Sequence, residues 1–216
     1  MSSNIKRIID RAIWPITVFR KMVLRKNSYL HTTGWIYSVK KGCPCKEDGT
    51  EIPWMNYAIV RFLEERLKKS IHLFEYGSGY STAFYANLVA DVTSVEYDQK
   101  WFYFIKNKMP NNARIIYKDK DVDGGYCRAI SETGKKYDIV IVDGRDRVNC
   151  VMQSINCLSE QGVIILDDSH REKYKQAINY SKEKGFRAIS LEGLKAPSYK
   201  AYETTILYRN NNCLGI

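Results

Sequence analysis

A short apolar segment that runs directly into a Gly-x-Gly turn restricts the possible folds of this chain most strongly. The segment reads Leu73-Phe74-Glu75-Tyr76-Gly77-Ser78-Gly79-Tyr80-Ser81-Thr82. It predicts a buried strand, a tight turn and a helix capped by Ser81 or Thr82, whose hydroxyls suit that position. Glycines in such a turn adopt unusual φ angles and let a ligand approach the backbone. Because open α/β sheets bind ligands outside the carboxyl ends of their strands, we expect a binding site at this turn.

Strand and helix patterns alternate along the chain after residue 70. Strands are expected near 71–76, 92–97, 113–117, 137–142, 162–167, 186–191 and 203–208. Helices are expected at 57–67, between the first two strands, and near 99–107, 147–158 and 171–184. The apolar runs at 140–142 and 163–166 are typical of strands buried on both faces of a parallel sheet. The last two strands are too close in sequence for a helical crossover, so they should be antiparallel neighbours.

The composition is that of one globular domain with a small N-terminal extension, since 44% of the 216 residues are hydrophobic and 27% charged. No apolar run approaches the roughly 20 residues of a membrane-spanning helix. The first residues also lack the pattern of a signal peptide, so a cytoplasmic location is expected. The six cysteines include no CxxC pair, and they are expected to be reduced thiols rather than zinc ligands.

Residues 4–26 combine helical spacing of apolar residues with a strong positive charge. Seven Lys or Arg residues against one Asp supply +6 of the net charge of +10, and Pro15 should kink this segment or divide it into two helices. One interpretation is an amphipathic helix on a membrane surface or a partner, which would make the protein membrane-peripheral. The other is a helix docked on its own domain, the commoner arrangement. We expect a basic helical extension and connector at 1–52 and a ligand-binding domain at 53–216.

Two further positions indicate which ligand the turn binds. Glu96 ends the next strand, 19 residues after Gly77, a spacing that lets its carboxylate accept hydrogen bonds from both hydroxyls of a ribose. Thr82 stands where the dinucleotide fingerprint G-x-G-x-x-G requires its third glycine, which argues against a pyrophosphate. The pattern therefore favours an adenosyl ligand.

These residues resemble the class I S-adenosyl-L-methionine (SAM)-dependent methyltransferases, over about residues 53–208. The segment 75–79 is similar to that family's first motif, and Glu96 to its ribose-binding acid. Within the family, four segments resemble a bacterial methyltransferase-like group. They are Ile52-Pro53-Trp54, Phe74 to Thr82, Val142-Asp143-Gly144-Arg145 and Leu166-Asp167-Asp168-Ser169. The resemblance implies a Rossmann-like three-layer α/β sandwich with a seven-stranded, mostly parallel sheet whose last strand is antiparallel.

The resemblance also implies a SAM site in the domain 53–216. Gly77 and Gly79 would approach the methionine part of SAM. Asp119, just after the third strand, would approach the adenine, with Asp121 as the alternative. The implied cofactor-binding residues are Glu75, Tyr76, Gly77, Ser78, Gly79, Ser81, Thr82, Glu96, Tyr97, Asp119 and Asp143.

Candidate catalytic residues gather after the fourth and fifth strands. Methyl transfer from a sulfonium is a direct displacement, which requires alignment of the acceptor and can require removal of a proton. One interpretation is a divalent cation, placed as in the catechol-type O-methyltransferases and held by Asp143, Asp167 and Asp168. Another is catalysis without a metal, in which Asp168 or His170 acts as general base beside Asp143. In the third, these acids only pair with Arg145, Arg147 and Arg171 to organise the loops.

The expected function is SAM-dependent methylation of an oxygen or nitrogen on a small molecule or a glycan-type substrate. Methylation of nucleic-acid bases is not expected, because the fourth strand ends in Val-Asp-Gly-Arg rather than Asn/Asp-Pro-Pro-Tyr/Phe. Two alternatives stay open: a non-catalytic SAM-binding scaffold protein, and an RNA methyltransferase recruited by the basic N-terminal segment. Four aromatic residues either line the pocket mouth or belong to the core: Trp54, Tyr57, Tyr80 and Trp101.

Overall fold

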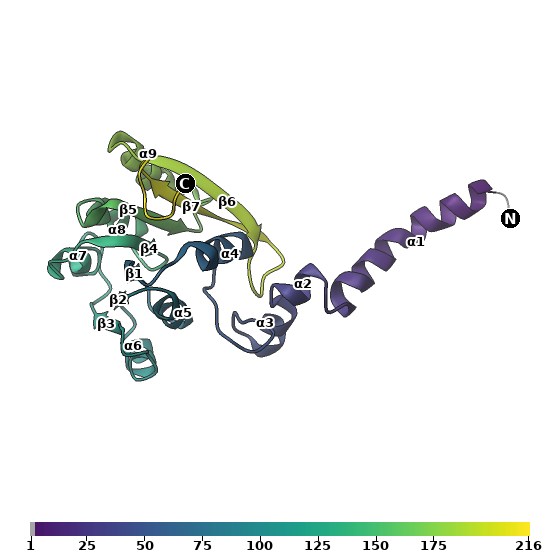
Figure 1. The fold of residues 1–216 in the computed structure, drawn as a ribbon, viewed down its shortest axis with the longest axis horizontal. Coiled ribbons are helices and arrows are strands. Elements are labelled where there is room, and N and C mark those ends of the chain that lie inside the picture. The colour runs from purple at the N-terminus through teal and green to yellow at the C-terminus, as the bar shows by residue number, and fades with distance from the viewer. Residues whose placement is uncertain (1–2) are drawn as a thin grey trace.

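A seven-stranded sheet forms the centre of the molecule (Figure 1). The computed structural model describes the backbone of residues 3–216 and the side chains of residue 11 and residues 13–216. The strands are β1 His72–Tyr76, β2 Asp91–Glu96, β3 Ala113–Tyr117, β4 Tyr137–Val142, β5 Leu158–Asp167, β6 Arg187–Leu194 and β7 Ala201–Tyr208. Their order is β3-β2-β1-β4-β5-β7-β6, and β7 is antiparallel to both of its neighbours while the others run parallel. The predicted sheet and its C-terminal antiparallel pair are confirmed.

Helices cover both faces of the sheet, which gives the predicted three layers. The domain helices are α4 Tyr57–Arg66, α5 Tyr80–Leu88, α6 Gln99–Lys106, α7 Gly125–Glu132, α8 Arg147–Ile155, the 3-10 helix η1 Glu172–Tyr174 and α9 Lys175–Glu183. Ile139 and Ile141 of β4 pack in the cluster that includes α4 and α5, whereas Val140 and Val142 pack in the cluster that includes α7, α8 and α9. All four are fully buried, and each contributes roughly 1.5–3 kcal/mol to folding.

The domain differs from the expectations in one helix and in several element boundaries. Helix α7 was not predicted, because Gly124 and Gly125 are typical of a loop. It forms because the Asp121 carboxylate accepts hydrogen bonds from the backbone N–H groups of Gly125 (2.6 Å) and Tyr126 (3.1 Å) and so caps its N-terminus. Strand β5 begins at Leu158, earlier than expected, and α8 ends at Ile155.

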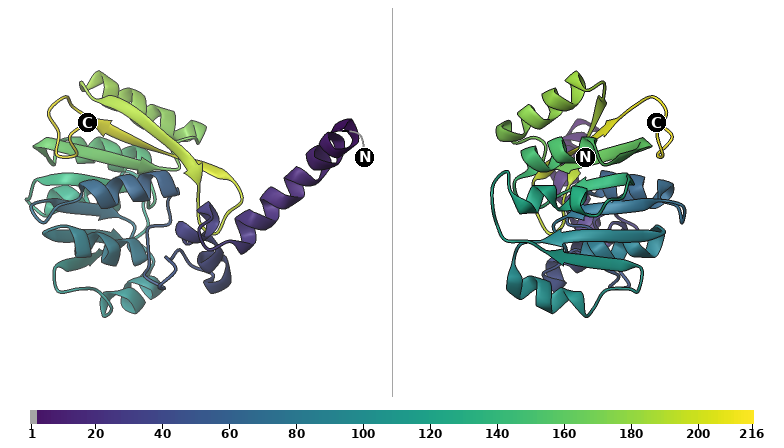
Figure 2. Two further views of the ribbon diagram at one scale, coloured as in Figure 1. Left: turned by 45° about the vertical axis from the view of Figure 1, so that its right-hand side comes forward. Right: turned by 90° about the vertical axis from the view of Figure 1, so that its left-hand side faces the viewer.

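The N-terminal segment differs most from its expected arrangement. Helix α1, Ser3–Leu24, is one continuous helix that contains Pro15, so the segment is not divided there. Proline removes one backbone hydrogen bond, but its fixed φ is itself helical, so the turns on either side can continue. The helix extends away from the domain instead of docking on it (Figures 1 and 2). Short helices α2, Tyr29–Thr32, and α3, Trp35–Lys41, connect it to the domain. Among the described helices, none is long and apolar enough to cross a membrane.

Candidate functional site

The turn after β1 packs directly against the turn after β4. Gly77 has a φ of +94°, and a Cβ added there would lie 3.1 Å from the Cα atom of Gly144. Glycine is therefore required both by its backbone conformation and by the close approach of the second turn. At Gly79 the backbone is extended, and an added Cβ would meet only Trp101, at 3.8 Å. This side of the turn is consequently open to a ligand.

A buried carboxylate holds the turn in this shape. Glu75 accepts one hydrogen bond from the hydroxyl of Ser81 and one from that of Thr82, both at 2.5 Å. The Thr82 hydroxyl also accepts a hydrogen bond from the Gly79 N–H at 3.0 Å. The N-cap of α5 is Gly79, so the expectation that Ser81 or Thr82 caps this helix is wrong. Both hydroxyls lie inside the first turn, where they bind Glu75.

Burial raises the pKa of Glu75 to about 7, which predicts a distinct pH dependence of stability. The folded state binds the proton more tightly than the unfolded state, so this contribution to stability falls as pH rises from about 4.5 to 7. Glu75→Gln cannot ionise, and the free energy of unfolding of the variant relative to wild type should rise by roughly 3 kcal/mol across that window. Urea unfolding at pH 4.5, 6, 7 and 8 measures this difference. A difference that stays constant with pH contradicts the prediction.

Glu96 stands at the end of β2 beside the same turn. One of its oxygens accepts hydrogen bonds from the Ser78 N–H (3.0 Å) and the Ser78 hydroxyl (2.8 Å). The other accepts from the backbone N–H groups of Tyr97 (2.8 Å) and Asp98 (2.9 Å). A carboxylate offers about four acceptor positions, so all are in use. Of the four donors, only the Ser78 hydroxyl can rotate away and leave its position to another hydroxyl.

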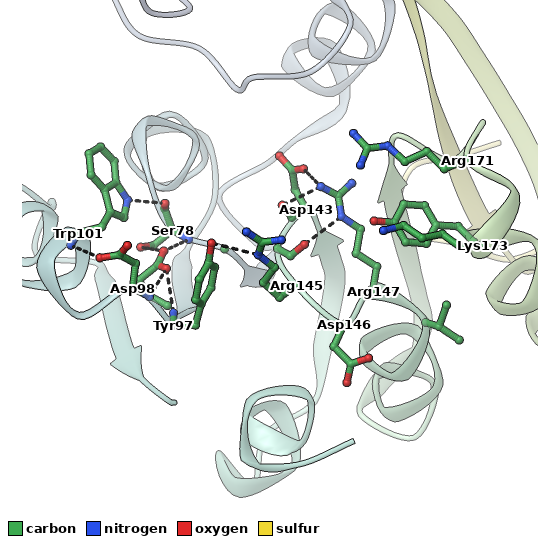
Figure 3. A pocket seen from close by; sticks show the side chains of 15 residues that line it. Ser78, Tyr97, Asp98, Trp101, Asp143, Arg145, Asp146, Arg147, Arg171 and Lys173 are labelled. Carbon is green, nitrogen blue, oxygen red and sulfur yellow. Dashed lines mark hydrogen bonds and ion pairs between the residues drawn. The ribbon is translucent and has the colours of Figure 1, made fainter. Parts of the chain in front are cut away.

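A cavity of about 730 Å³ opens at the carboxyl ends of β1, β2 and β4 (Figure 3). Its volume lies within the roughly 300–1,000 Å³ typical of small-molecule sites. Gly77, Ser78 and Glu96 line one end, where the Trp101 indole N–H donates to the Ser78 carbonyl at 2.8 Å. The remaining lining residues are Tyr97, Asp98, Trp101, Asp143, Gly144, Arg145, Asp146, Arg147, Val148, Arg171, Lys173 and Tyr174.

A smaller hollow of about 210 Å³ adjoins the cavity. The two share Gly77, Ser78, Trp101 and Asp143 as lining residues. Connector residues contribute to the smaller one, and its other lining residues are Pro44, Ile52, Trp54, Gly79, Tyr80 and Ser81. Three of the four aromatic candidates, Trp54, Tyr80 and Trp101, thus line this region, whereas Tyr57 does not.

The acids after β4 and β5 surround a buried guanidinium. Arg147 donates to the Asp143 carboxylate at 2.7 Å and to the Asp167 backbone carbonyl at 2.5 Å, and it lies 3.8 Å from the Asp168 carboxylate. The Lys195 ammonium lies 2.9 Å from Asp167 and 3.2 Å from Asp168, and Arg171 pairs with Asp168 at 2.5 Å. In the part of the chain that the structure describes, no group of three or more His, Cys, Asp or Glu side chains is arranged to hold a metal ion. The Arg147 guanidinium lies among the acids that the metal hypothesis requires.

This network shifts two of the carboxyl groups in opposite directions. Burial, together with the neighbouring Asp167, raises the pKa of Asp143 although Arg147 is beside it. For Asp168, burial alone would raise the pKa, but the charges of Lys195, Arg147 and Arg171 lower it below its usual value. Asp143 lines the cavity, whereas Asp168 is neutralised by cations. The two candidates for catalysis therefore have different environments.

Other predicted site residues lie away from the cavity. His170 is exposed and packs edge-on against Tyr202, with ring centroids 5.7 Å apart. Asp119 accepts a hydrogen bond from the Tyr117 hydroxyl, and Asp121 caps α7. The Tyr76 side chain is buried in the core, where its hydroxyl donates to the Cys127 carbonyl. None of these four lines either of the two hollows.

Several residues in or beside the site were not predicted for it. Arg145 was considered only as a partner of the acids, and it instead donates to the Tyr97 hydroxyl at 3.1 Å. Lys173 and Tyr174 come from η1, and Lys195 reaches the acids from the segment after β6. Local sequence carries no signal for Lys195, because it is 27 residues from Asp168 and the fold alone brings them together.

Comparison with known proteins shows which of them share this fold. No protein-family model and no curated protein sequence matches the chain. Among solved structures, the precorrin-6y C5,15-methyltransferase of Geobacter metallireducens is similar with a TM-score of 0.55 and 13% identity, over 77% of this chain and 97% of that one. A Streptococcus mutans protein in complex with SAH has a TM-score of 0.51 and 14% identity, over 68% and 94%. The rRNA methylase of Streptococcus thermophilus has a TM-score of 0.50 and 14% identity, over 69% and 92%.

The chain therefore has the Rossmann-like fold of the class I SAM-dependent methyltransferases. The similar structures include methyltransferases named for precorrin and for rRNA. Fold similarity of this kind leaves the acceptor undetermined, so the acceptor has to be inferred from the site itself.

Proposed function

We propose that this protein is a SAM-dependent methyltransferase that acts on an oxygen or nitrogen of a small-molecule or glycan-type substrate. One observation carries the proposal: Glu96 and Gly77 line one cavity at the carboxyl ends of the strands, and Gly79 lines the hollow that adjoins it. An acid beside a glycine turn at that edge suits a ribose with its attached chain.

The lining residues fit SAM in both size and chemistry. Glu96 would accept a hydrogen bond from a ribose hydroxyl in place of the Ser78 hydroxyl. The Tyr97 ring and the Arg145 side chain offer a flat surface for the adenine, since they lie against each other at the cavity wall. The turn from Gly77 to Gly79 leaves room for the methionine part. When bound, SAM supplies an activated methyl group on a sulfonium.

Asp143 is the residue that we assign to proton transfer. It lines both hollows, and its raised pKa suits a group that takes a proton from an acceptor hydroxyl or amine. Arg147 holds its carboxylate in place. Asp168 is engaged by three cations and His170 lies outside the cavity, so neither suits this role as well.

The size of the hollows supports a small acceptor or the terminus of a glycan. The hollow beside Asp143 is lined by Trp54, Tyr80 and Trp101, and its volume of about 210 Å³ suits a single ring. The same open region argues against a scaffold protein that binds SAM without transferring its methyl group. An RNA acceptor is an outcome that the methylation assay distinguishes, since an rRNA methylase shares the fold.

Isothermal titration calorimetry with SAM and with S-adenosylhomocysteine tests the proposal directly. We expect saturable binding of both ligands at one site with micromolar affinity. Absence of heat at high micromolar ligand, with protein shown to be folded by circular dichroism, would sink the proposal. Transfer from methyl-labelled SAM to small-molecule, glycan or RNA fractions then identifies the acceptor class.

A further inference from the structure

We propose that helix α1 binds the surface of an anionic lipid bilayer and lies in the plane of the interface. The inference concerns residues 3–24 and their basic neighbours Arg25 and Lys26, and it does not depend on the methyltransferase activity. Three observations carry it: the position of the helix, the exposure of its apolar side chains and its charge.

The helix lies outside the folded domain. In Figure 1 and in the left view of Figure 2, α1 leaves the domain through α2 and extends into solvent. Its C-terminal turn is held by the Ser28 hydroxyl, which donates to the Met22 carbonyl at 2.7 Å, and by the His31 ring, 2.8 Å from the Val23 carbonyl. These contacts fix the exit of the helix without covering its sides.

The exposed helix carries large apolar side chains. Trp14 and Ile16 are each 62% exposed, and Phe19 is 69% exposed. The other exposed apolar side chains of the described part of the helix are Ile13, Met22 and Leu24. Such side chains would be buried if the helix docked on its own domain. Exposed large apolar side chains gathered on one element mark an interaction surface.

Apolar side chains gather on one side of the helix. Ile16, Phe19 and Val23 are spaced i, i+3 and i+7, so they lie on one face. Thr17 and Lys21 are spaced i, i+4 and lie toward the opposite face. Trp14 lies seven residues before Lys21 on that same side, with its ring 6.0 Å from the Lys21 ammonium. A basic side opposite an apolar side that carries Phe19 is typical of helices that lie in a membrane interface.

The positive charge of this segment favours an anionic bilayer as the binding partner. Residues 4–26 contain seven Lys or Arg residues and one Asp. Two such helices from two copies would repel each other, which argues against self-association through this face. An RNA would satisfy the charge but would leave Ile16 and Phe19 in water. An anionic membrane satisfies both, because it attracts basic side chains and admits apolar ones.

Binding through α1 would bring the candidate site to the membrane. The connector that follows α1 contributes Pro44, Ile52 and Trp54 to the smaller hollow. It is also tied to the β6–β7 loop, since the Trp35 indole N–H donates to the Ser198 carbonyl at 2.7 Å. The helix thus leaves the domain at the edge of the sheet where the cavity opens.

Co-sedimentation with vesicles tests the inference on the full-length protein. The probes are vesicles of phosphatidylcholine alone and vesicles in which about 30% of the lipid is anionic phosphatidylglycerol, both at about 50 mM salt, where surface charge is weakly screened. We expect binding to the anionic vesicles only. Ile16→Gln/Phe19→Gln should weaken it at least about 10-fold, since two apolar anchors are lost. Arg20→Gln/Lys21→Gln should weaken it roughly 25-fold, at about five-fold per charge.

Lys182→Gln/Lys184→Gln is the matched control, because it removes two positive charges from exposed positions around the end of α9. It should bind the anionic vesicles like wild type. Thermal melts of all variants should coincide, because the substituted side chains lie at the surface. Three results would overturn the inference: no binding to anionic vesicles, equal loss in the α9 control, or an Ile16→Gln/Phe19→Gln variant that binds like wild type. Binding to single-stranded RNA without binding to vesicles would overturn it as well.

Discussion

Replacing Glu96 with alanine should weaken the binding of SAM and of S-adenosylhomocysteine by roughly 10- to 100-fold, because a hydrogen bond to a charged acceptor, worth about 1.5–3 kcal/mol, is lost. Glu96 is buried beside the Gly77 turn, and its carboxylate faces the cavity. In the variant, the ribose hydroxyl that would replace the Ser78 hydroxyl has no charged acceptor. Titration calorimetry of the variant against wild type measures the loss.

Ser78→Ala is the matched control for the Glu96 variant. The Ser78 hydroxyl occupies one acceptor position of Glu96, and a ribose hydroxyl has to displace it. Without that hydroxyl, the affinity for SAM should stay within a few-fold of wild type or increase by up to about five-fold, since a net hydrogen bond is worth about 1 kcal/mol. An equal loss in both variants contradicts the assignment, because the damage would then come from a disturbed turn rather than from a lost ribose contact.

Much of the fold could be predicted from periodicity alone. The run Ile139-Val140-Ile141-Val142 is apolar at every position because both faces of β4 are covered, and this pattern does not depend on distant residues. Helix α7 could not be predicted in the same way. Its N-terminus depends on the Asp121 carboxylate, and its two glycines favour a loop when read locally. The sequence also could not predict that α1 extends away from the domain, because an amphipathic pattern does not indicate what covers the apolar face.

The candidate site also contains residues that the sequence predicts and residues that it does not. The sequence predicts Gly77, Gly79 and Glu96, because the spacing between a glycine turn and the acid at the end of the next strand is a recognisable motif. The side chains on the other side of the cavity depend on tertiary contacts. Lys195 engages Asp167 and Asp168 only because β6 and β7 return to the edge of β5. The cofactor end of the site is therefore more predictable from sequence than the acceptor end.

The Arg147 guanidinium lies among these acids, where the metal hypothesis would place a metal ion. Its guanidinium is buried and contacts Asp143, the Asp167 carbonyl and the Gly144 carbonyl, the last at 3.0 Å. Arg147→Met keeps most of the side-chain volume but leaves a buried carboxylate without its partner. Breaking a buried ion pair in this way should lower the free energy of unfolding by about 3–5 kcal/mol at pH 8. Urea unfolding measures the change.

The pH dependence and a second arginine separate a lost charge from a lost contact. The pKa of Asp143 is already raised by burial, and removal of Arg147 raises it further, so the carboxyl group is protonated at pH 5 and no longer carries an unpaired charge. The folded state then binds the proton more tightly, and the cost of Arg147→Met should be smaller at pH 5 than at pH 8. Arg171→Met removes an exposed partner of Asp168 and should cost less than about 1 kcal/mol at either pH. If Arg147→Met costs as little as Arg171→Met, or costs the same at both pH values, the buried guanidinium does not hold the acids together.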